Sequence, residues 1–244
     1  MNVLFISDLH CPYQHPDALL FLAALKKKYK FKRVICLGDE LDYHAMSFHD
    51  HDVNLSSAGD ELQKGREALW ELWAMFPNMD LVESNHGSMA YRKGTSHGIP
   101  RHLLLEYKDA IFGEKAKDGT IYRPKNRGTG WNWHSTLIVK FGNQNCLIVH
   151  GRSTSTRRNV EQSGMCFVQG HHHGLFELIY HGTSDFLNWG MTIGCLIDDQ
   201  SIAFAYNKNS IKRPIMGCGA WIDGKPRLLP MQLSTGGRWT GLVP

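Results

Sequence analysis

Five short apolar runs, each followed at once by polar residues, constrain the fold of this chain more than any other feature. The runs read as buried strands, and they are 3–6, 34–37, 79–82, 146–149 and 165–168. Polar clusters such as Asp8-Leu9-His10 stand where each strand is expected to end. Because an α/β sheet keeps its ligands at strand ends, the pattern predicts a site built from several loops.

The clustered side chains are carboxylates, a carboxamide and imidazoles, which suit Mn, Fe, Ni or Zn. The candidate metal ligands are Asp8, His10, Asp39, Asn85, His150, His171 and His173. Asp8 and His10 lie two apart on a segment expected to be extended, which would point both side chains to one face, and the same spacing separates His171 from His173. Asp39 follows a glycine at a tight strand end, where one carboxylate could bridge two ions. We therefore expect two divalent transition-metal ions, with Mn²⁺ favoured and Fe, Ni or Zn as alternatives.

In chain order the clusters read Asp-x-His, Gly-Asp-x-x-Asp, Asn-His, His-Gly and Gly-His-x-His, and they extend from Asp8 to His173. Together they resemble the calcineurin-like metallophosphoesterase superfamily. The resemblance implies one ion held by Asp8, His10, Asp39 and His173, and a second held by Asp39, Asn85, His150 and His171. It also agrees with an α/β fold of two facing mixed β-sheets flanked by helices, an α/β sandwich, in one domain spanning residues 1–244.

The expected order of elements is strand and helix in alternation, followed by a long β-rich half. Helices are expected at 17–29, 57–76 and 100–112. A hairpin is expected from 135–141 and 145–150, and further strands at 175–180, 191–196, 201–206 and 216–222. The segment 113–133 lacks periodicity, and we expect it to form a mobile rim.

Composition agrees with one compact enzyme domain, because 244 residues with 42% hydrophobic content can bury a real core. The apolar runs are too short for a membrane span, and the chain opens on a strand without a signal segment, so we expect a cytoplasmic protein and no membrane partner. The six cysteines show no paired spacing and are expected to be buried, reduced thiols. The net charge of +4 permits a polyanionic partner without requiring one.

A pair of ions in such a site would acidify a bridging water and supply a hydroxide for in-line attack on a phosphoryl group. His86 follows Asn85 directly, and it is placed to protonate or stabilise the leaving oxygen. The resemblance implies that Asp42 orients this imidazole, and we expect that carboxylate to raise its pKa. Ser84 and Gly87 depart from the common Gly-Asn-His-Asp/Glu pattern, so the tuning of His86 is open.

The substrate is predicted less sharply. Tyr43-His44 stands where related protein serine/threonine phosphatases carry Arg-Gly, which disfavours a phosphoprotein. Candidate substrate-binding residues are Asn85, Arg92, Arg152, Arg157 and Arg158. Tyr91, Trp131 and Trp133 are available to stack on bases, which favours DNA, RNA or a nucleotide as the phosphoester. The loop 49–52 alternates His and Asp, and it is either solvated or an extension of the metal site.

Three alternatives stay open. Monoester and diester cleavage are not separated by these residues, and the substrate could be a small non-nucleotide phosphoester. The chain could also be a non-catalytic metal-binding scaffold of the same fold. A decayed site would lack ligands, whereas all seven candidates and His86 are present here.

Overall fold

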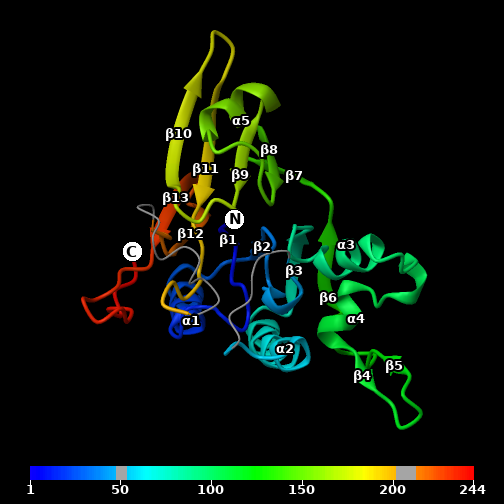
Figure 1. Cartoon of the computed structure of the whole chain (residues 1–244). Coiled ribbons are helices and arrows are strands. Elements are labelled where there is room, and N and C mark those ends of the chain that lie inside the picture. The colour runs from blue at the N-terminus through cyan, green and yellow to red at the C-terminus, as the bar shows by residue number, and fades with distance from the viewer. Residues whose placement is uncertain (48–53, 202–212) are drawn as a thin grey trace.

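The structure is a computed structural model that describes residues 1–47, 54–201 and 213–244, and two β-sheets form its centre (Figure 1). The first sheet has the order β13-β12-β1-β2-β3-β6, and the second has the order β10-β11-β9-β8-β7. The strands of the first sheet are β1 (Val3–Ile6), β2 (Arg33–Cys36), β3 (Asn78–Val82), β6 (Gly130–His134), β12 (Gly217–Ile222) and β13 (Lys225–Pro230). Those of the second are β7 (Leu137–Phe141), β8 (Gln144–Val149), β9 (Cys166–Gln169), β10 (Phe176–Gly182) and β11 (Leu187–Ile193).

Both sheets are mixed, as the sequence predicts. In the first, β1, β2, β3 and β6 are parallel, and β12 pairs antiparallel with both β1 and β13. In the second, β8, β9 and β11 are parallel, and the edge strands β7 and β10 are antiparallel to their neighbours. The parallel strands of each sheet therefore end at a common edge. A small separate hairpin is formed by β4 (Glu114–Lys115) and β5 (Ile121–Tyr122).

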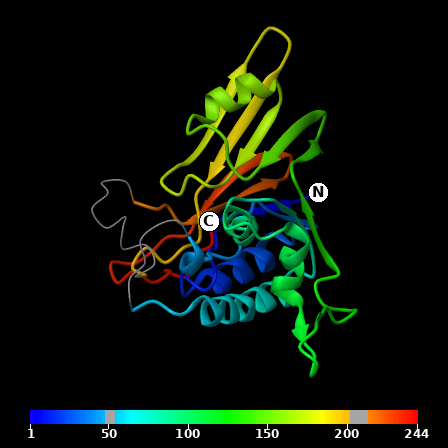
Figure 2. The same cartoon turned by 45° about the vertical axis from the view of Figure 1, so that its right-hand side comes forward.

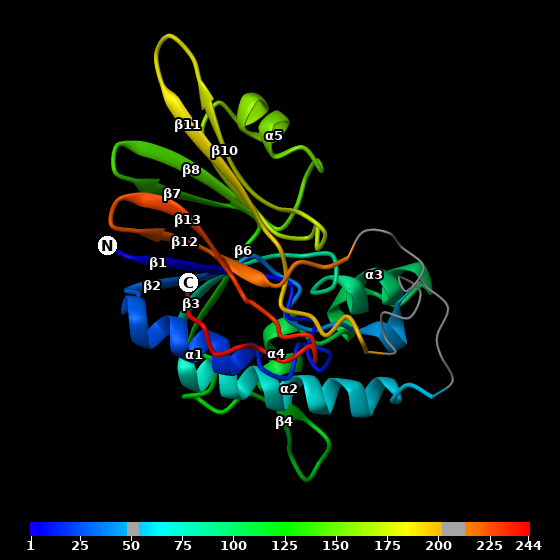
Figure 3. The same ribbon diagram turned by 90° about the vertical axis from the view of Figure 1, so that its left-hand side faces the viewer.

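Helices cover the outer faces of both sheets, as Figures 2 and 3 show. The longer helices are α1 (Ala18–Tyr29), α2 (Ala58–Met75), α3 (Met89–Ser96), α4 (Tyr107–Phe112) and α5 (Thr156–Ser163). Within the described ranges there are also two 3₁₀ turns, η1 (His44–Met46) and η2 (Arg101–Leu103). Side chains of α1, α2 and α4 pack on the first sheet, and Val160 of α5 packs on the second. Among the described residues, no helix combines the length and apolarity that a membrane crossing requires.

The alternation of side chains along β1 shows how the layers are joined. Val3 and Phe5 point into a cluster shared with the second sheet, whereas Leu4 and Ile6 point into the cluster shared with the helices. All four are completely buried. Successive residues of a strand face opposite sides, so a strand covered on both faces is apolar throughout. The result is the predicted sandwich of two sheets between helices.

The first two helices agree closely with the sequence. The side chain of Ser57 accepts a hydrogen bond from the Asp60 amide at the start of α2, which satisfies one unpaired donor of the helix. Three lysines lie in the last turn of α1, where they complement the helix dipole. The six cysteines are buried and free, as expected. The predicted strand at 201–206 lies outside the described residues except for Ser201, and the loop 49–52 lies outside them entirely.

The expectation of one helix at 100–112 was wrong. Only η2 and α4 are helical there, because Leu104 and Glu106 adopt extended backbone between them. Leu104 packs against Gly94 of α3, where a Cβ atom would come within 2.7 Å of its Cδ1. The sequence analysis also missed α3. Leu104, which interrupts the expected helix, is the residue that packs against α3.

The segment 113–133 is not an irregular rim throughout, because its last part enters β6 and pairs parallel with β3. Trp131 is completely buried in the core beneath the first sheet, and its indole N–H donates to the carbonyl of Phe76 at 2.8 Å. Trp133 also packs against that core. The buried indole of Trp131 is therefore not an open platform for a base, which corrects the stacking role expected for it.

A salt bridge fastens the C-terminal segment to the start of α1. The guanidinium of Arg238 donates two hydrogen bonds to Asp17, and the amide of Trp239 donates to the same carboxylate at 3.0 Å. His15 also faces the carbonyl of Gly237 at 2.8 Å. The hydrogen bonds from Arg238 hold the pKa of Asp17 well below its usual range, although burial opposes the shift.

We predict that Asp17→Asn lowers the free energy of unfolding by about 1 kcal/mol at pH 7, since Arg238 is largely exposed and its charge is screened. A carboxyl whose pKa is depressed in the folded state stabilises the fold above its unfolded pKa of about 4, and this contribution is lost as pH falls through the folded value. The difference from wild type should therefore shrink below pH ~4. Urea titrations from pH 3 to 8 measure it, with exposed Asp185→Asn as control. A difference that grows with acid would contradict the assignment.

Candidate metal centre

The predicted site residues come together where the parallel strands of both sheets end. Asp8 and His10 follow β1, Asp39 and Asp42 follow β2, and Asn85 and His86 follow β3 in the first sheet. His150 follows β8, and His171 and His173 follow β9 in the second. The amide of Gly170 donates to the carbonyl of His150 at 2.8 Å, which joins the last two loops. The site therefore draws side chains from five loops and both sheets.

The loops are not extended as expected at Asp8 and His10. Both residues have left-handed backbone, with φ of 53° and 52°, and Asp39 and His171 do too, with φ of 53° and 64°. The reason is that β1 ends at Ile6 and the chain then turns beside the loop after β2. The amide of Asp8 donates to the carbonyl of Gly38 at 3.0 Å, and the amide of His10 donates to that of Asp39 at 2.9 Å. These bonds hold a backbone conformation that costs energy for residues with a side chain.

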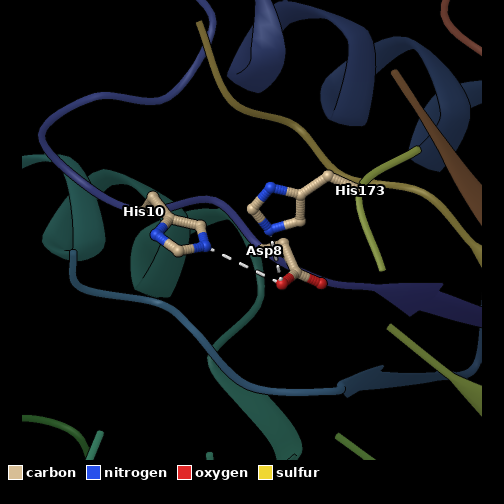
Figure 4. Close-up of side chains that lie close together, drawn as sticks. All are labelled: Asp8, His10 and His173. Atoms are coloured by element: carbon tan, nitrogen blue, oxygen red, sulfur yellow. Dashed lines mark hydrogen bonds and ion pairs between the residues drawn. The ribbon is translucent and has the colours of Figure 1, made fainter. Parts of the chain in front are cut away.

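The first cluster is formed by Asp8, His10 and His173, each offering a ligand atom within 4.8 Å of the others (Figure 4). Nε2 of His173 lies 3.1 Å from Oδ1 of Asp8, and Nε2 of His10 lies 3.7 Å from the same oxygen. The other oxygen of Asp8 accepts from the amide of His171 at 2.8 Å and from the hydroxyl of Ser7. One carboxylate oxygen is thus fixed by the chain, and the other faces the imidazoles.

The second cluster is formed by Asp39, His150 and His171, with ligand atoms again within 4.8 Å. Nε2 of His150 lies 3.1 Å from Oδ2 of Asp39, 2.7 Å from Oδ1 of Asn85 and 3.1 Å from Nδ1 of His171. Oδ2 of Asp39 also lies 3.6 Å from Nε2 of His10 in the first cluster. One carboxylate oxygen is therefore shared between the two clusters.

The tautomers of two histidines are set by their surroundings. Nδ1–H of His10 donates to Oδ1 of Asp42 at 2.5 Å, and Nδ1–H of His150 donates to the carbonyl of Leu37 at 2.8 Å. Each leaves Nε2 directed at the carboxylates, as in metal sites where a second hydrogen bond orients the ligand. Carboxylate oxygen, carboxamide oxygen and imidazole nitrogen are a donor set that fits two divalent transition metals.

The electrostatics of the clusters favour bound cations. Burial opposes ionisation of Asp8, yet hydrogen bonds from His10 and His173 outweigh it and hold the pKa of Asp8 well below its usual range. Burial likewise opposes the ionised form of Asp39, but His150 keeps its pKa low. Asp39 in turn raises the pKa of His150 to about 9 against the effect of burial. Two buried carboxylates thus hold protons on nearby imidazoles, at positions where a metal ion would compete with those protons.

The arrangement of His86 and Asp42 differs from the expectation. Oδ1 of Asp42 is bonded to His10 and lies 3.8 Å from Nδ1 of His86, which donates instead to the main-chain carbonyl of Asp42. Burial and the neighbouring His10 lower the pKa of His86, so the expected rise was wrong. The chain turns at Tyr43, with φ of 55°, and this turn presents the carboxylate to one imidazole and the carbonyl to the other.

Ser84 has a structural role at one of the two positions that depart from the Gly-Asn-His-Asp/Glu pattern. Its hydroxyl accepts hydrogen bonds from the amide of Asp39 at 3.0 Å and from the amide of Gly87 at 3.1 Å, which ties the loops after β2 and β3 together. Gly38 allows this approach, because its φ is 102° and a Cβ atom there would lie 2.5 Å from that of Ser84. The serine is visible in the sequence, but the two amides that it serves are brought together only by the sheet.

The candidate substrate residues fall into two groups. Arg92 on α3 donates to the carbonyl of Asn85 at 2.8 Å, and Arg152 is exposed directly after the His150 loop. Arg157 and Arg158 are exposed on α5, which lies over the outer face of the second sheet (Figure 3). Arg92 and Arg152 are therefore the two that adjoin metal-ligand loops.

No protein-family model matches this chain, and no curated protein matches it. Solved structures do. Vps29 from Chaetomium thermophilum, in complex with a RaPID-derived cyclic peptide, is 11% identical with a TM-score of 0.50, over 100% of this chain and 94% of that one. An archaeal phosphodiesterase is 14% identical with a TM-score of 0.47, over 94% and 99%. The phosphoesterase Yfce from E. coli is 13% identical with a TM-score of 0.46, over 99% and 97%.

At such low identity a structural match shows the fold and nothing more. The match to Vps29 extends over the whole chain, and it agrees with the two mixed sheets and outer helices described above. The chain has the calcineurin-like metallophosphoesterase fold.

Proposed function

We propose that this chain is a binuclear metal-dependent phosphoesterase that hydrolyses phosphomonoester or phosphodiester bonds. The observation that carries the proposal is the shared carboxylate, since Oδ2 of Asp39 lies 3.6 Å from Nε2 of His10 and 3.1 Å from Nε2 of His150. When bound, two divalent cations supply Lewis acidity toward a phosphoryl group and make water acidic enough to attack near neutral pH. We propose Mn²⁺ as the physiological ion, with Fe, Ni or Zn as alternatives.

The proposed ligand sets are those implied by the resemblance, and the geometry supports each. Asp8, His10 and His173 hold one ion with Asp39, and His150, His171 and Asn85 hold the other with Asp39. His86 is assigned to the leaving group instead of to coordination. Its Nδ1–H is held by the carbonyl of Asp42, which fixes the ring at the side of His10, with the ring centroids 4.5 Å apart. A ligand atom of His86 lies within 4.8 Å of those of His10 and Asp39, so the imidazole stands directly beside the proposed ions.

We propose that the substrate is a nucleic acid or a nucleotide. Support comes from exposed Arg92 and Arg152, which adjoin the loops of Asn85 and His150 and would meet phosphates beyond the scissile one. The buried indole of Trp131 removes one of the stacking groups that the sequence offered for this substrate, and Tyr91 on α3 is exposed. Arg157 and Arg158 would extend the same basic path along α5.

The deciding experiment is a substrate panel with purified protein and Mn²⁺. It compares a chromogenic phosphodiester, a chromogenic phosphomonoester, a single-stranded oligonucleotide and a cyclic nucleotide. Cleavage of the oligonucleotide or cyclic nucleotide supports the proposed substrate class. Turnover of small esters alone would favour a small-phosphoester enzyme, and no turnover by fully metal-loaded protein would favour a binding scaffold.

We predict that Asp39→Asn loses both bound ions and all measurable phosphoesterase activity. The reason is that removing the shared negative charge leaves two cations repelling each other at short distance. Metal analysis after equilibrium dialysis measures the occupancy, with Asp185→Asn as an exposed control that should keep two ions. Full two-ion occupancy in Asp39→Asn would show that the shared ligand is misassigned.

We predict that His86→Ala keeps both ions and lowers kcat by about 10²- to 10⁴-fold on a substrate with a poor leaving group. The loss should be smaller for nitrophenolate, which scarcely needs a proton. His102→Ala, in the exposed turn after α3, serves as control and should keep wild-type rates. If the loss is equal for good and poor leaving groups, His86 only positions the phosphate, and if metal is lost as well, it is a ligand.

We predict that replacing Arg152, Arg157 and Arg158 together by alanine weakens oligonucleotide binding and makes its salt dependence shallower. Each phosphate contact that is lost removes about 0.7 from the slope for a single strand. Hydrolysis of a small chromogenic ester should be unchanged, because that substrate reaches only the metals. The control replaces exposed Lys115, Lys117 and Lys125 in the β4–β5 region, which changes the net charge equally. An unchanged slope would show that the three arginines do not contact the oligonucleotide and are ordinary solvent-exposed residues.

A further inference from the structure

Glu61 is a buried carboxylate on α2, and it belongs to none of the candidate metal clusters found among the described residues. It is 2% exposed, and its helix face is otherwise made of Gly65, Leu69 and Leu72. The residues of that face lie three or four apart and point at the first sheet. An apolar side chain would suit this position, because burying a carboxylate is costly unless its oxygens are matched. Burial and the nearby Asp42 carboxylate raise the pKa of Glu61 to about 7, because both disfavour its ionised form.

Both oxygens of Glu61 are used by the chain just after Asp42. Oε1 accepts a hydrogen bond from the amide of His44 at 2.6 Å, and Oε2 accepts one from the amide of Ala45 at 2.8 Å. These amides begin η1, and its capping residue, Tyr43, provides no side-chain bond of its own. A single side chain of α2 therefore satisfies the first donors of this turn and fixes where the turn begins.

Gly65 brings α2 close to the other side of Asp42. A Cβ atom at Gly65 would lie 2.6 Å from Cδ2 of Leu41 and 2.9 Å from the carbonyl oxygen of Cys11. That same carbonyl accepts the amide of Asp42 at 3.0 Å. Helix α2 thus holds the chain on both sides of Asp42. Leu41 is held by close packing against Gly65, and His44 and Ala45 are held by hydrogen bonds to Glu61.

Asp42 in turn orients His10, since its Oδ1 accepts Nδ1–H of that imidazole at 2.5 Å. A displacement of the backbone at Asp42 would therefore move a metal ligand of the first cluster. His150 and His171 of the second cluster come from the other sheet, and His150 is oriented by the carbonyl of Leu37 instead. The two clusters should accordingly differ in their dependence on α2.

We propose that Glu61 is a positioning residue that holds Asp42, and through it His10, in the geometry required by the first metal ion. The proposal rests on the function proposed above, in that it assigns an ion to the cluster of Asp8, His10 and His173. Gly65 has the supporting role of allowing α2 to approach. Neither residue touches the substrate or the ions.

The test measures Mn²⁺ binding by calorimetry for Glu61→Ala, Glu61→Gln and Glu61→Asp, after circular dichroism has shown that each variant is folded. We expect Glu61→Ala to weaken the ion of the first cluster by about 10- to 100-fold and to spare the second, the usual effect of losing a residue that orients a ligand. Glu61→Gln keeps one hydrogen-bond acceptor, so its Mn²⁺ affinity at the first cluster should lie between those of wild type and Glu61→Ala. Glu71→Gln, exposed on the same helix, is the matched control.

A second readout needs neither metal nor turnover. In metal-free protein, ¹⁵N NMR of the imidazoles should show the Nδ1–H signal of His10 shifted or lost in Glu61→Ala and retained in Glu71→Gln. If wild type binds no metal, the proposed function fails, and this signal still decides the positioning role. Should Glu61→Ala fail to fold, Glu61→Gln provides both measurements. Wild-type metal affinity together with an unchanged His10 signal in a folded Glu61 variant would overturn the proposal.

Discussion

Two buried carboxylates, those of Asp8 and Asp39, are the constraint on which the rest of the site depends. Both are excluded from water, and like charges placed close together must be compensated by donors or cations. The chain neutralises part of each group, since Asp8 accepts the amide of His171 and Asp39 accepts the amide of His86. The other oxygen of each carboxylate, Oδ1 of Asp8 and Oδ2 of Asp39, is directed at imidazole nitrogens. The arrangement is costly for a protein without ions, and that cost is the physical argument for a metal centre.

Residues around the candidate ligands hold them in place through hydrogen bonds. His10 and His150 each use one ring nitrogen for the chain and leave the other for an ion. Behind them, Ser84 joins two loops through backbone amides, and Glu61 does the same for the turn after Asp42. Such contacts come from distant parts of the sequence. They preorganise the ligands before any ion binds, which reduces the entropy that binding must overcome.

Apolar runs with polar ends predicted β1 and the parallel strands beside it, because burial on both faces leaves a plain mark in the sequence. The sequence did not predict local backbone, since the turn at Asp8 depends on a hydrogen bond to the carbonyl of Gly38. Nor could it decide which imidazole the carboxylate of Asp42 would meet. β6 was missed because its alternation of tryptophan with polar residues resembles a loop until it is paired with β3. Long-range partners, invisible in local patterns, account for each of these failures.

Each of the two clusters proposed to hold an ion takes residues from both sheets. Asp8 and His10 are joined by His173 across the sandwich, and Asp39 is joined by His150 and His171. The sheets touch closely here, since a Cβ atom at Gly170 would lie 2.5 Å from Oδ2 of Asp8. Neither sheet supplies all the residues of either of these two clusters, so the proposed binding of ions there would be thermodynamically linked to docking of the sheets and would add to the cohesion of the two layers. Separation of the layers would abolish both clusters at once, which makes metal retention a measure of whether the sandwich is closed.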